Sequence, residues 1–404
     1  MLNDSRITFL MTFGHCGIDW MHSLIDSHNQ ILLTPALSFY RCWKMLEAQS
    51  ASNTNEMFDI WNSYITKYIG PDSFNKQKQL LHTDKEMEVF FVQFRKYLES
   101  EGYDKISVFW AIHESYAHAK GINTDKIKSI VVHEHMPWPF KEVLSDFKNV
   151  NFIIMMRDPR AAIAGIIKGR VSDFGYLQDF TFNIIFEMWL QGNDINKKYS
   201  KKLGNRLKIV KNEDLHDSLD KNMRDIADWL KVDFNKSMLV PTDAKGIILI
   251  PDSRYLDGYN QEIYDSEFYS PESVRKRWLS VLSDSRDILM IEVLFKDLME
   301  QFGYDRISQY TYLSHLKGVM LFLLPNHALF SKWQVDYPDI EEFSRIDNRL
   351  KKTIGSGHKI WDILPSPIKL SFLIVISFFR RVMIYFFPGE RWKRYDFSIV
   401  NKLK

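Results

Sequence analysis

Two histidines and a glutamate follow one of the apolar segments of the chain. The segment SIVV leads directly into His133, Glu134 and His135. An imidazole suits proton transfer near neutral pH, and a glutamate is a second candidate for the same task. In an extended strand, residues two apart face the same side, so one metal ion would reach both histidines, with Asp19 or His15 as a third ligand. The pattern predicts a general base, a metal site or packed structural histidines.

A glycine-bounded turn near the N-terminus is a candidate phosphate site. It runs from Phe13 to Trp20 with the sequence FGHCGIDW, between an apolar segment and a helical pattern. A helix that begins at such a turn offers free backbone N–H groups and the positive end of its dipole to an anion. The turn lacks the Gly-Lys-Ser/Thr of a Walker A loop. It predicts a phosphate loop or an ordinary connection between a strand and a helix.

Two side chains of this turn have alternative interpretations. Asp19 is either a first-turn residue that accepts hydrogen bonds from backbone donors, or a ligand of a metal or a sugar hydroxyl. Its carboxylate would lie close to a bound phosphate, which is unfavourable unless a cation or a proton intervenes. Cys16 lacks a downstream arginine at the spacing that phosphatases use, so the pattern does not favour a nucleophilic cysteine.

An arginine follows a second apolar segment, VNFIIMM. The sequence there continues Arg157-Asp158-Pro159-Arg160. A guanidinium binds two phosphate oxygens at once, so Arg157 is a candidate for an anionic ligand. The alternative is a surface arginine that precedes a helix started by Pro159.

The elements that would position these residues alternate along the chain. Such alternation predicts an α/β fold, a P-loop-like parallel sheet flanked by helices. We expect strands at 6–13, 129–132, 150–156 and 207–210, and helices at 19–27, 35–50, 55–68, 85–100, from about 160, 180–198, 218–231 and 284–302.

The pattern changes after Gly303, where we predict a helical C-terminal extension over 306–404, following a first domain over 1–305. No uninterrupted apolar stretch reaches the roughly 18–20 residues of a spanning helix. Residues 368–404 combine dense apolar side chains with Arg380, Arg381 and a basic tail. This composition predicts contact with an anionic membrane surface, or a helix that packs on the catalytic domain or on a second copy.

Bulk properties narrow the cellular context. The formal net charge of +2 gives no reason to expect a nucleic-acid partner. Cys16 and Cys42 cannot form a disulfide framework, and the first residues, MLNDSRITFLMTF, lack the features of a signal peptide. These observations predict a cytoplasmic protein, with peripheral contact at the inner face of a membrane as a further expectation.

The segment TFGHCGIDWMHSLIDSHNQI resembles the first cofactor motif of the sulfotransferase family, in which a loop like Pro-Arg-Ser-Gly-Thr-Thr precedes a leucine-rich helix and Asp-Ser-His-Pro. The helix from His22 to His28 matches nearly throughout, and Gly17 is retained. The resemblance implies that the loop wraps the 5′-phosphosulfate of 3′-phosphoadenosine 5′-phosphosulfate. The residues that would do so are Gly14, His15, Cys16, Gly17, Ile18 and Asp19.

The chain departs from this motif where the chemistry takes place. His15 stands at the basic position that balances charge during transfer, and Cys16 stands at the serine position. Ile18 and Asp19 replace the pair of threonines. The loop has therefore lost hydroxyl donors and gained a carboxylate.

Arg157-Asp158-Pro159-Arg160 resembles the second cofactor motif of the family, whose first arginine binds the 3′-phosphate. The serine that assists it in the family corresponds to Gly165. The strand end His133-Glu134-His135 resembles Lys-Thr-His, which implies that His135 is the base and His133 takes the place of the lysine. Glu134 is a second candidate, because some glycan and protein sulfotransferases use a glutamate.

Two later motifs extend the resemblance to about residue 305. KIVKNEDLHDS resembles a structural Arg-Tyr-Glu-Asp-Leu motif, with Glu213, Asp214 and Leu215 in matching positions. The segment from Arg277 to Tyr304 resembles the closing helix, which ends in Phe-Gly-Tyr.

The resemblance implies an enzyme that moves a sulfuryl group from 3′-phosphoadenosine 5′-phosphosulfate to a hydroxyl of a carbohydrate or glycan, without a metal. One alternative keeps the fold and uses another donor, such as a nucleotide-sugar held with a divalent metal. Another is a non-catalytic module, which would bind no nucleotide.

Overall fold

The computed structural model describes residues 7–34, 38–40, 42–43, 51–69, 81, 83–134, 137–174, 177–243, 247–248, 270–324, 335–336 and 366–387. Most of the helix predicted over 35–50 lies outside these residues, and so does His135.

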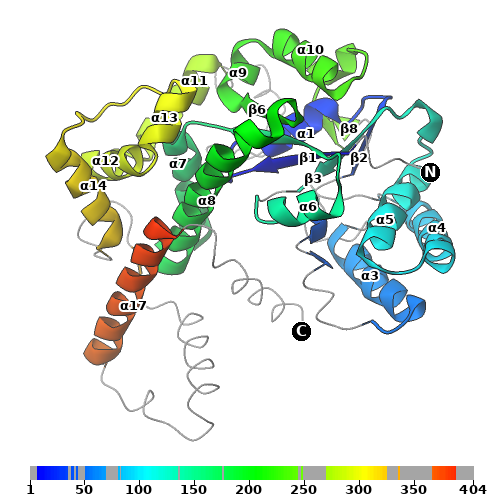
Figure 1. The fold of residues 1–404 in the computed structure, drawn as a ribbon, viewed down its shortest axis with the longest axis horizontal. Helices are drawn as coiled ribbons and strands as arrows, with labels where there is room; N and C mark the ends of the chain where they lie inside the picture. The colour runs from blue at the N-terminus through cyan, green and yellow to red at the C-terminus, as the bar shows by residue number, and fades with distance from the viewer. Residues whose placement is uncertain are drawn as a thin grey trace, which may run out of the picture.

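A parallel sheet of five strands forms the centre of the fold, in the order β2-β3-β1-β4-β6 (Figure 1). All neighbouring pairs in it are parallel. The strands are β1 (Ile7–Thr12), β2 (Ile31–Thr34), β3 (Ser129–His133), β4 (Asn151–Met156) and β6 (Leu207–Lys211). The predicted α/β fold with a parallel sheet is confirmed.

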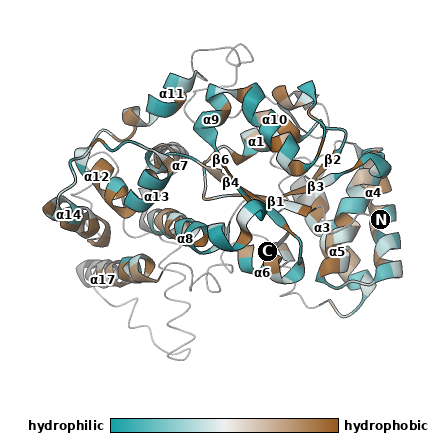
Figure 2. Ribbon diagram, turned by 45° about the horizontal axis from the view of Figure 1, so that its top comes forward, coloured by the Kyte–Doolittle hydropathy of each residue, from teal (hydrophilic) through white to brown (hydrophobic). Residues whose placement is uncertain are grey.

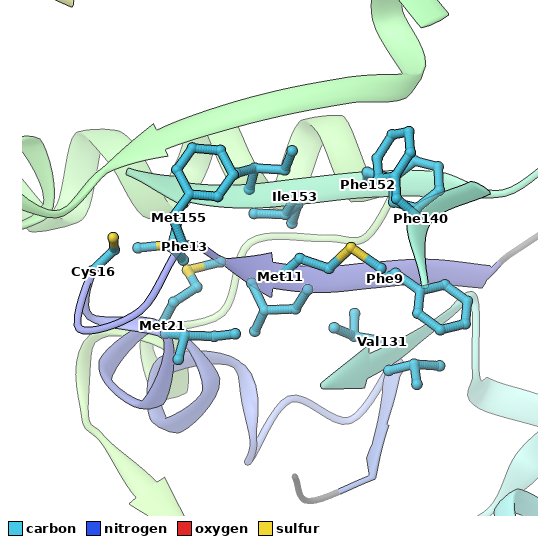
Figure 3. Packing of buried hydrophobic residues seen from close by; sticks show 14 of the residues in the cluster. Phe9, Met11, Phe13, Cys16, Met21, Val131, Phe140, Phe152, Ile153 and Met155 are labelled. Atoms are coloured by element: carbon cyan, nitrogen blue, oxygen red, sulfur yellow. The ribbon is translucent and has the colours of Figure 1, made fainter. Parts of the chain in front are cut away.

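The central strand is apolar because helices cover both faces of the sheet. All six residues of β1 are buried, and their sequence ITFLMT shows no alternation between polar and apolar positions. Phe9 and Met11 of β1 pack among side chains from β4 and the helices (Figure 3). The ring centroids of Phe140 and Phe152 lie 4.2 Å apart in the same core.

Helices flank the sheet or pack on the helices that flank it (Figure 2). They are α1 (Ile18–Ile25), α3 (Thr54–Ile69), α4 (Asp84–Glu101), α5 (Lys105–Ala119), α6 (Phe140–Asp146), α7 (Pro159–Phe174), α8 (Asp179–Leu203), α9 (Asn212–Asp217), α10 (Leu219–Leu230), α11 (Pro271–Lys276), α12 (Ser285–Leu294), α13 (Lys296–Phe302), α14 (Tyr312–Leu323) and α17 (Ser366–Phe386). Two short strand pairs accompany them, β5 (Leu177–Gln178) with β9 (Val335–Asp336) and β7 (Thr242–Asp243) with β8 (Ile247–Ile248).

The described part of the C-terminal extension packs on the preceding residues. Phe322 of α14 lies against Phe186 of α8, with ring centroids 5.3 Å apart. Gly318 lets α14 approach α12 closely, because a Cβ there would come within 2.6 Å of Val293. Helix α17 lies along α8 (Figure 1). Among the described residues, no helix is both long enough and apolar enough to cross a membrane.

The carboxyl ends of β1 and β4 lie side by side at the point where the strand connections diverge. The chain leaves β1 for β2 on one side, whereas it leaves β4 for β6 on the other. Ligands of open α/β sheets bind where such connections diverge, beyond the carboxyl ends of the two strands. The FGHCGIDW turn follows β1 and Arg157 follows β4, so both candidate anion-binding features lie at this point.

Candidate functional site

The turn after β1 has a backbone that requires glycine at two positions. Gly14, His15 and Gly17 have φ angles of 99°, 51° and 79°, which lie in the left-handed region. A Cβ on Gly14 would come within 2.4 Å of Met188, and one on Gly17 within 2.0 Å of the amide oxygen of Asn212. The two glycines therefore fold the turn tightly against α8 and α9.

The turn presents the N-terminus of α1 without a side-chain cap. Gly17 is the N-cap residue and accepts the first helical hydrogen bond, from Met21, but has no side chain to satisfy the first-turn donors. Asp19 lies in the first turn, and its side chain is 67% exposed. The helix N-terminus would thus attract a bound anion, whereas the carboxylate of Asp19 would repel it.

Cys16 points into the protein. Its thiol is buried and donates a hydrogen bond to the carbonyl oxygen of Gly14 over 3.2 Å. Burial raises the pKa of Cys16 to about 12, so the thiol stays protonated at neutral pH. Cys16 therefore shapes the turn through its position and packing, and it is unsuited to nucleophilic attack.

Arg157 lies directly behind the turn. The residue is only 6% exposed, and its Nη1 is 3.4 Å from the carbonyl oxygen of His15. A second long hydrogen bond of 3.5 Å reaches the carbonyl oxygen of Val274, and the carboxylate of Glu213 is 4.0 Å from Nε. The Nε atom itself is buried without a hydrogen-bond partner. The guanidinium is thus enclosed by the protein but weakly paired.

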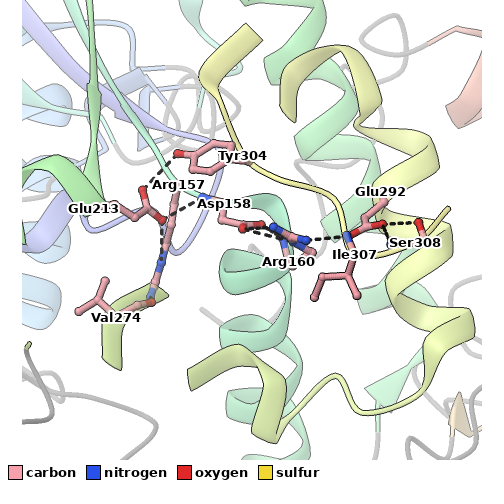
Figure 4. A network of polar contacts seen from close by, with 9 residues as sticks. All are labelled: Arg157, Asp158, Arg160, Glu213, Val274, Glu292, Tyr304, Ile307 and Ser308. Carbon is pink, nitrogen blue, oxygen red and sulfur yellow. Dashed lines mark hydrogen bonds and ion pairs between the residues drawn. The ribbon is translucent and has the colours of Figure 1, made fainter. Parts of the chain in front are cut away.

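Arg160, one turn further along, has strong partners. Its Nε and Nη2 donate to Asp158 over 3.0 and 2.6 Å, and its Nη1 donates to Glu292 over 2.6 Å. Glu292 also accepts from the backbone N–H of Ile307. Arg160 therefore ties α7 to α12 and to the segment after α13 (Figure 4).

The two late sequence motifs meet at the same place. Glu213 of α9 accepts a hydrogen bond from the backbone N–H of Asp158 and another from the hydroxyl of Tyr304, both over 3.1 Å. Burial raises the pKa of Glu213, and the nearby positive charge of Arg157 opposes that rise. The motif predicts a structural role for Glu213, and in the structure its carboxylate lies beside Arg157.

A pair of histidines lies on the other side of the turn. The Nδ1 atoms of His133 and His22 are 2.9 Å apart, so one ring carries a proton there and the other accepts it. The Nε2 of His133 lies 3.9 Å from a carboxylate oxygen of Asp19. Exposed Asp19 thus lies near a pair of buried imidazoles. This arrangement was not predicted from the sequence.

The other predicted site residues are spread more widely. Glu134 is 1% exposed and accepts a hydrogen bond from the backbone N–H of Tyr40 over 3.2 Å, a position suited to holding the segment around residue 40. The side chain of His15 is exposed. Gly165 is buried within α7, about two turns beyond Arg157. His135 lies outside the described residues, and the base role predicted for it stays a prediction.

The described residues do not bring three histidine, cysteine or carboxylate side chains together as a metal site. The His133 and His135 pair is not covered by this observation, because only His133 is described. Within the described part, His133 faces His22 and Asp19 instead.

No protein family model and no curated protein matches the chain. Among solved structures, it is similar to a sulfotransferase domain from the curacin biosynthetic pathway, with 16% identity, a TM-score of 0.47, and coverage of 74% of this chain and 98% of that one. The sulfotransferase domain of the Synechococcus PCC 7002 olefin synthase has 16% identity and a TM-score of 0.41, with 74% and 94% covered. A sulfotransferase from Mycobacterium avium has 12% identity and a TM-score of 0.38, with 76% and 79% covered. At such low identities and TM-scores, donor and acceptor have to be inferred from the residues of this chain.

Proposed function

We propose that the chain is a sulfotransferase-like transferase, with 3′-phosphoadenosine 5′-phosphosulfate as donor and a hydroxyl of a carbohydrate or glycan as acceptor. The observation that carries the proposal is the weak pairing of Arg157. Burying a charge without close partners is costly, and Arg160 shows that this same turn can pair an arginine fully. A phosphate group would supply the partners that Arg157 lacks.

The residues at the carboxyl ends of β1 and β4 are suited to such a donor. The uncapped N-terminus of α1 would hold its 5′-phosphosulfate, and Arg157 would hold its 3′-phosphate. When bound, the nucleotide supplies an activated sulfuryl group on a phosphate leaving group. The exposed side chain of His15 would balance the charge that develops there.

Two routes are available for the proton of the acceptor hydroxyl. His135 is the base that the resemblance implies. Among the described residues, Asp19 faces solvent next to the turn, and His133 Nε2 lies behind it to take the proton onward. The Nε2 atom of His133 lies 3.9 Å from the Asp19 carboxylate, so this carboxylate has a basic neighbour next to the proposed phosphate position.

Calorimetric titration tests the choice of donor. We expect 3′-phosphoadenosine 5′-phosphate, the product nucleotide, to bind equally well with and without magnesium, and uridine diphosphate glucose to bind weakly in both conditions. Binding of the sugar nucleotide that depends on magnesium would overturn the proposal in favour of the alternative donor. Absence of binding by either nucleotide would leave the non-catalytic alternative.

A further inference from the structure

Large apolar side chains are exposed mainly at one end of the molecule. Within the part of the chain that the structure describes, all exposed large hydrophobic residues except Val92, Val240 and Leu279 lie between Ile307 and Phe387. Most of them belong to α14 and α17, which are neighbours at this end (Figure 1). Scattered exposed hydrophobic residues are ordinary, but a concentration of this kind marks an interaction surface.

The exposed residues follow helical spacing. We define the α14–α17 face as the seven outward side chains of these helices: Tyr312, Leu313, Leu316, Met320, Val375, Phe379 and Phe386. On α14, Tyr312, Leu316 and Met320 are spaced by four residues and Leu313 lies next to the first of them, and on α17 the residues recur at intervals of four and seven from Val375. Tyr312 is 81% exposed and Phe379 61% exposed. Each helix therefore has one apolar side that the described residues do not cover.

The opposite sides of both helices are firmly packed. Arg381 of α17 is buried and donates to the side-chain oxygen of Asn183 on α8 and to the carbonyl oxygen of Phe322 on α14, both over 3.0 Å. Ile384 and Ser377 are buried on the same side of α17. The outward side chains are consequently held in place by the packing of the inward ones.

Charge indicates which partner this face suits. Neither α14 nor α17 contains an aspartate or a glutamate, and Arg381, the buried cation of α17, faces the protein. Lys317 is exposed among the apolar residues of α14. The same helices of a second copy would offer no acidic residue to pair with Lys317, which disfavours self-association. An anionic lipid surface offers both an apolar layer and the opposite charge.

We propose that the α14–α17 face binds the interface of an anionic lipid bilayer. The apolar side chains enter the boundary between headgroups and acyl chains, and Lys317 contacts the headgroups. The helices lie on the membrane and do not cross it. The inference is independent of the donor nucleotide, and it adds α14 to the membrane contact that the sequence predicts for residues 368–404.

Vesicle flotation of the full chain tests this inference. The vesicles are phosphatidylcholine alone, or equal parts of phosphatidylcholine and phosphatidylglycerol. We expect flotation with the anionic vesicles, weaker flotation with the neutral ones, and a loss of at least about tenfold in partitioning when Leu316→Glu and Phe379→Glu are combined. Val92→Glu combined with Leu279→Glu is the matched control, because both residues are exposed hydrophobics elsewhere, and we expect it to float like the unaltered chain.

Three results would overturn the inference. One is an unaltered chain that floats with neither vesicle, as it would if another segment covered the face. Another is equal flotation of the Leu316→Glu, Phe379→Glu variant. A third is a dimer, measured by light scattering, that this variant converts to a monomer while no vesicle binding occurs. Nucleotide titration of the same preparations separates these results from a failure of the proposed donor.

Discussion

At the scale of single residues, Arg157 and Arg160 are expected to have different roles: Arg157 binds a ligand, and Arg160 stabilises the fold. Both arginines are buried, but the close partners of Arg160 are two carboxylates, whereas Arg157 has long hydrogen bonds and one distant carboxylate. Removing one member of a closely paired, buried set leaves the other charges uncompensated. The two positions should therefore respond differently to the same substitution.

We predict that Arg160→Gln lowers the free energy of unfolding by about 3–5 kcal/mol, because Asp158 and Glu292 lose their shared cation. Arg157→Gln should cost about 1 kcal/mol, because it breaks only long contacts. Urea denaturation of both variants measures the difference. Equal losses of stability would contradict the distinction between the two arginines.

A buried histidine on α5 predicts how stability depends on pH. Burial lowers the pKa of His113 from 6.5 to about 4, and its ring nitrogens lie 2.7 Å from the carbonyl oxygen of Phe109 and 3.2 Å from the hydroxyl of Thr34. Between these pKa values the unfolded chain binds a proton that the folded chain does not. This contribution to stability is therefore complete above pH 6.5 and is lost as the pH falls towards 4, by about 3 kcal/mol.

The measurement is urea denaturation at several pH values between 4 and 7. His113→Gln should flatten the dependence on pH, whatever its effect on absolute stability. His118→Gln on the same helix is the control, because that side chain is exposed. An unchanged slope in the His113 variant would contradict the account.

At the scale of elements, the connection from β1 to α1 was predictable because all its signals are local. A short apolar run, two glycines and a helical period stand next to one another in the sequence. Strand β2 and helix α5 were not predicted. β2 has only four residues, and α5 is buried on most sides, which removes the apolar stripe that identifies a surface helix.

The helix predicted over 284–302 is divided into α12 and α13 at Phe295, a buried residue between them. The pairing of His133 with His22 was also beyond prediction, because the residues are 111 positions apart and meet only when β3 lies beside β1. Long-range contacts of this kind have no local signal in one sequence.

The tight turn before α1 gives a prediction about a single methyl group. Gly17→Ala adds a Cβ that would collide with Asn212, in a backbone conformation that disfavours alanine. Gly121→Ala also has a positive φ, of 61°, but lies in open space. We expect Gly17→Ala to be less stable than Gly121→Ala by about 1–3 kcal/mol, the usual cost of overpacking.

Thermal or urea unfolding of both variants measures this difference, and nucleotide titration follows its effect on the site. Combining Gly17→Ala with Asn212→Ala should recover part of the lost stability, because the collision is relieved while the backbone strain remains. Equal stability of the Gly17 and Gly121 variants would show that the turn is looser than its geometry indicates.

At the scale of the whole molecule, Arg381 connects the C-terminal helix to the rest of the structure. From the sequence, Arg380 and Arg381 were expected either to form a basic edge that faces a membrane or to belong to a packed helix. In the structure, Arg381 is buried between α8 and α14, whereas Phe379 faces outward. One helix therefore packs on the protein and exposes an apolar side.

We predict that Arg381→Met detaches α17, because the substitution removes the hydrogen bonds that the buried guanidinium donates to Asn183 and to the carbonyl oxygen of Phe322. Chymotrypsin should then cleave at Phe378 and Phe379 roughly tenfold faster, since proteolysis follows the population of the open form. Lys317→Met on α14 is the control, because it removes an exposed cation. Equal cleavage rates in the two variants would contradict the anchoring role of Arg381.

The central claim is that Arg157 binds a phosphate group of a nucleotide, and calorimetry tests this claim most directly. The unaltered chain, Arg157→Gln and the exposed control Arg224→Gln are titrated with 3′-phosphoadenosine 5′-phosphate and with adenosine 5′-monophosphate. We predict that the unaltered chain and the control prefer the 3′-phosphorylated nucleotide by about 10- to 100-fold, and that Arg157→Gln loses this preference. Equal affinity of the unaltered chain for both nucleotides, or a preference that survives in Arg157→Gln, would contradict the account.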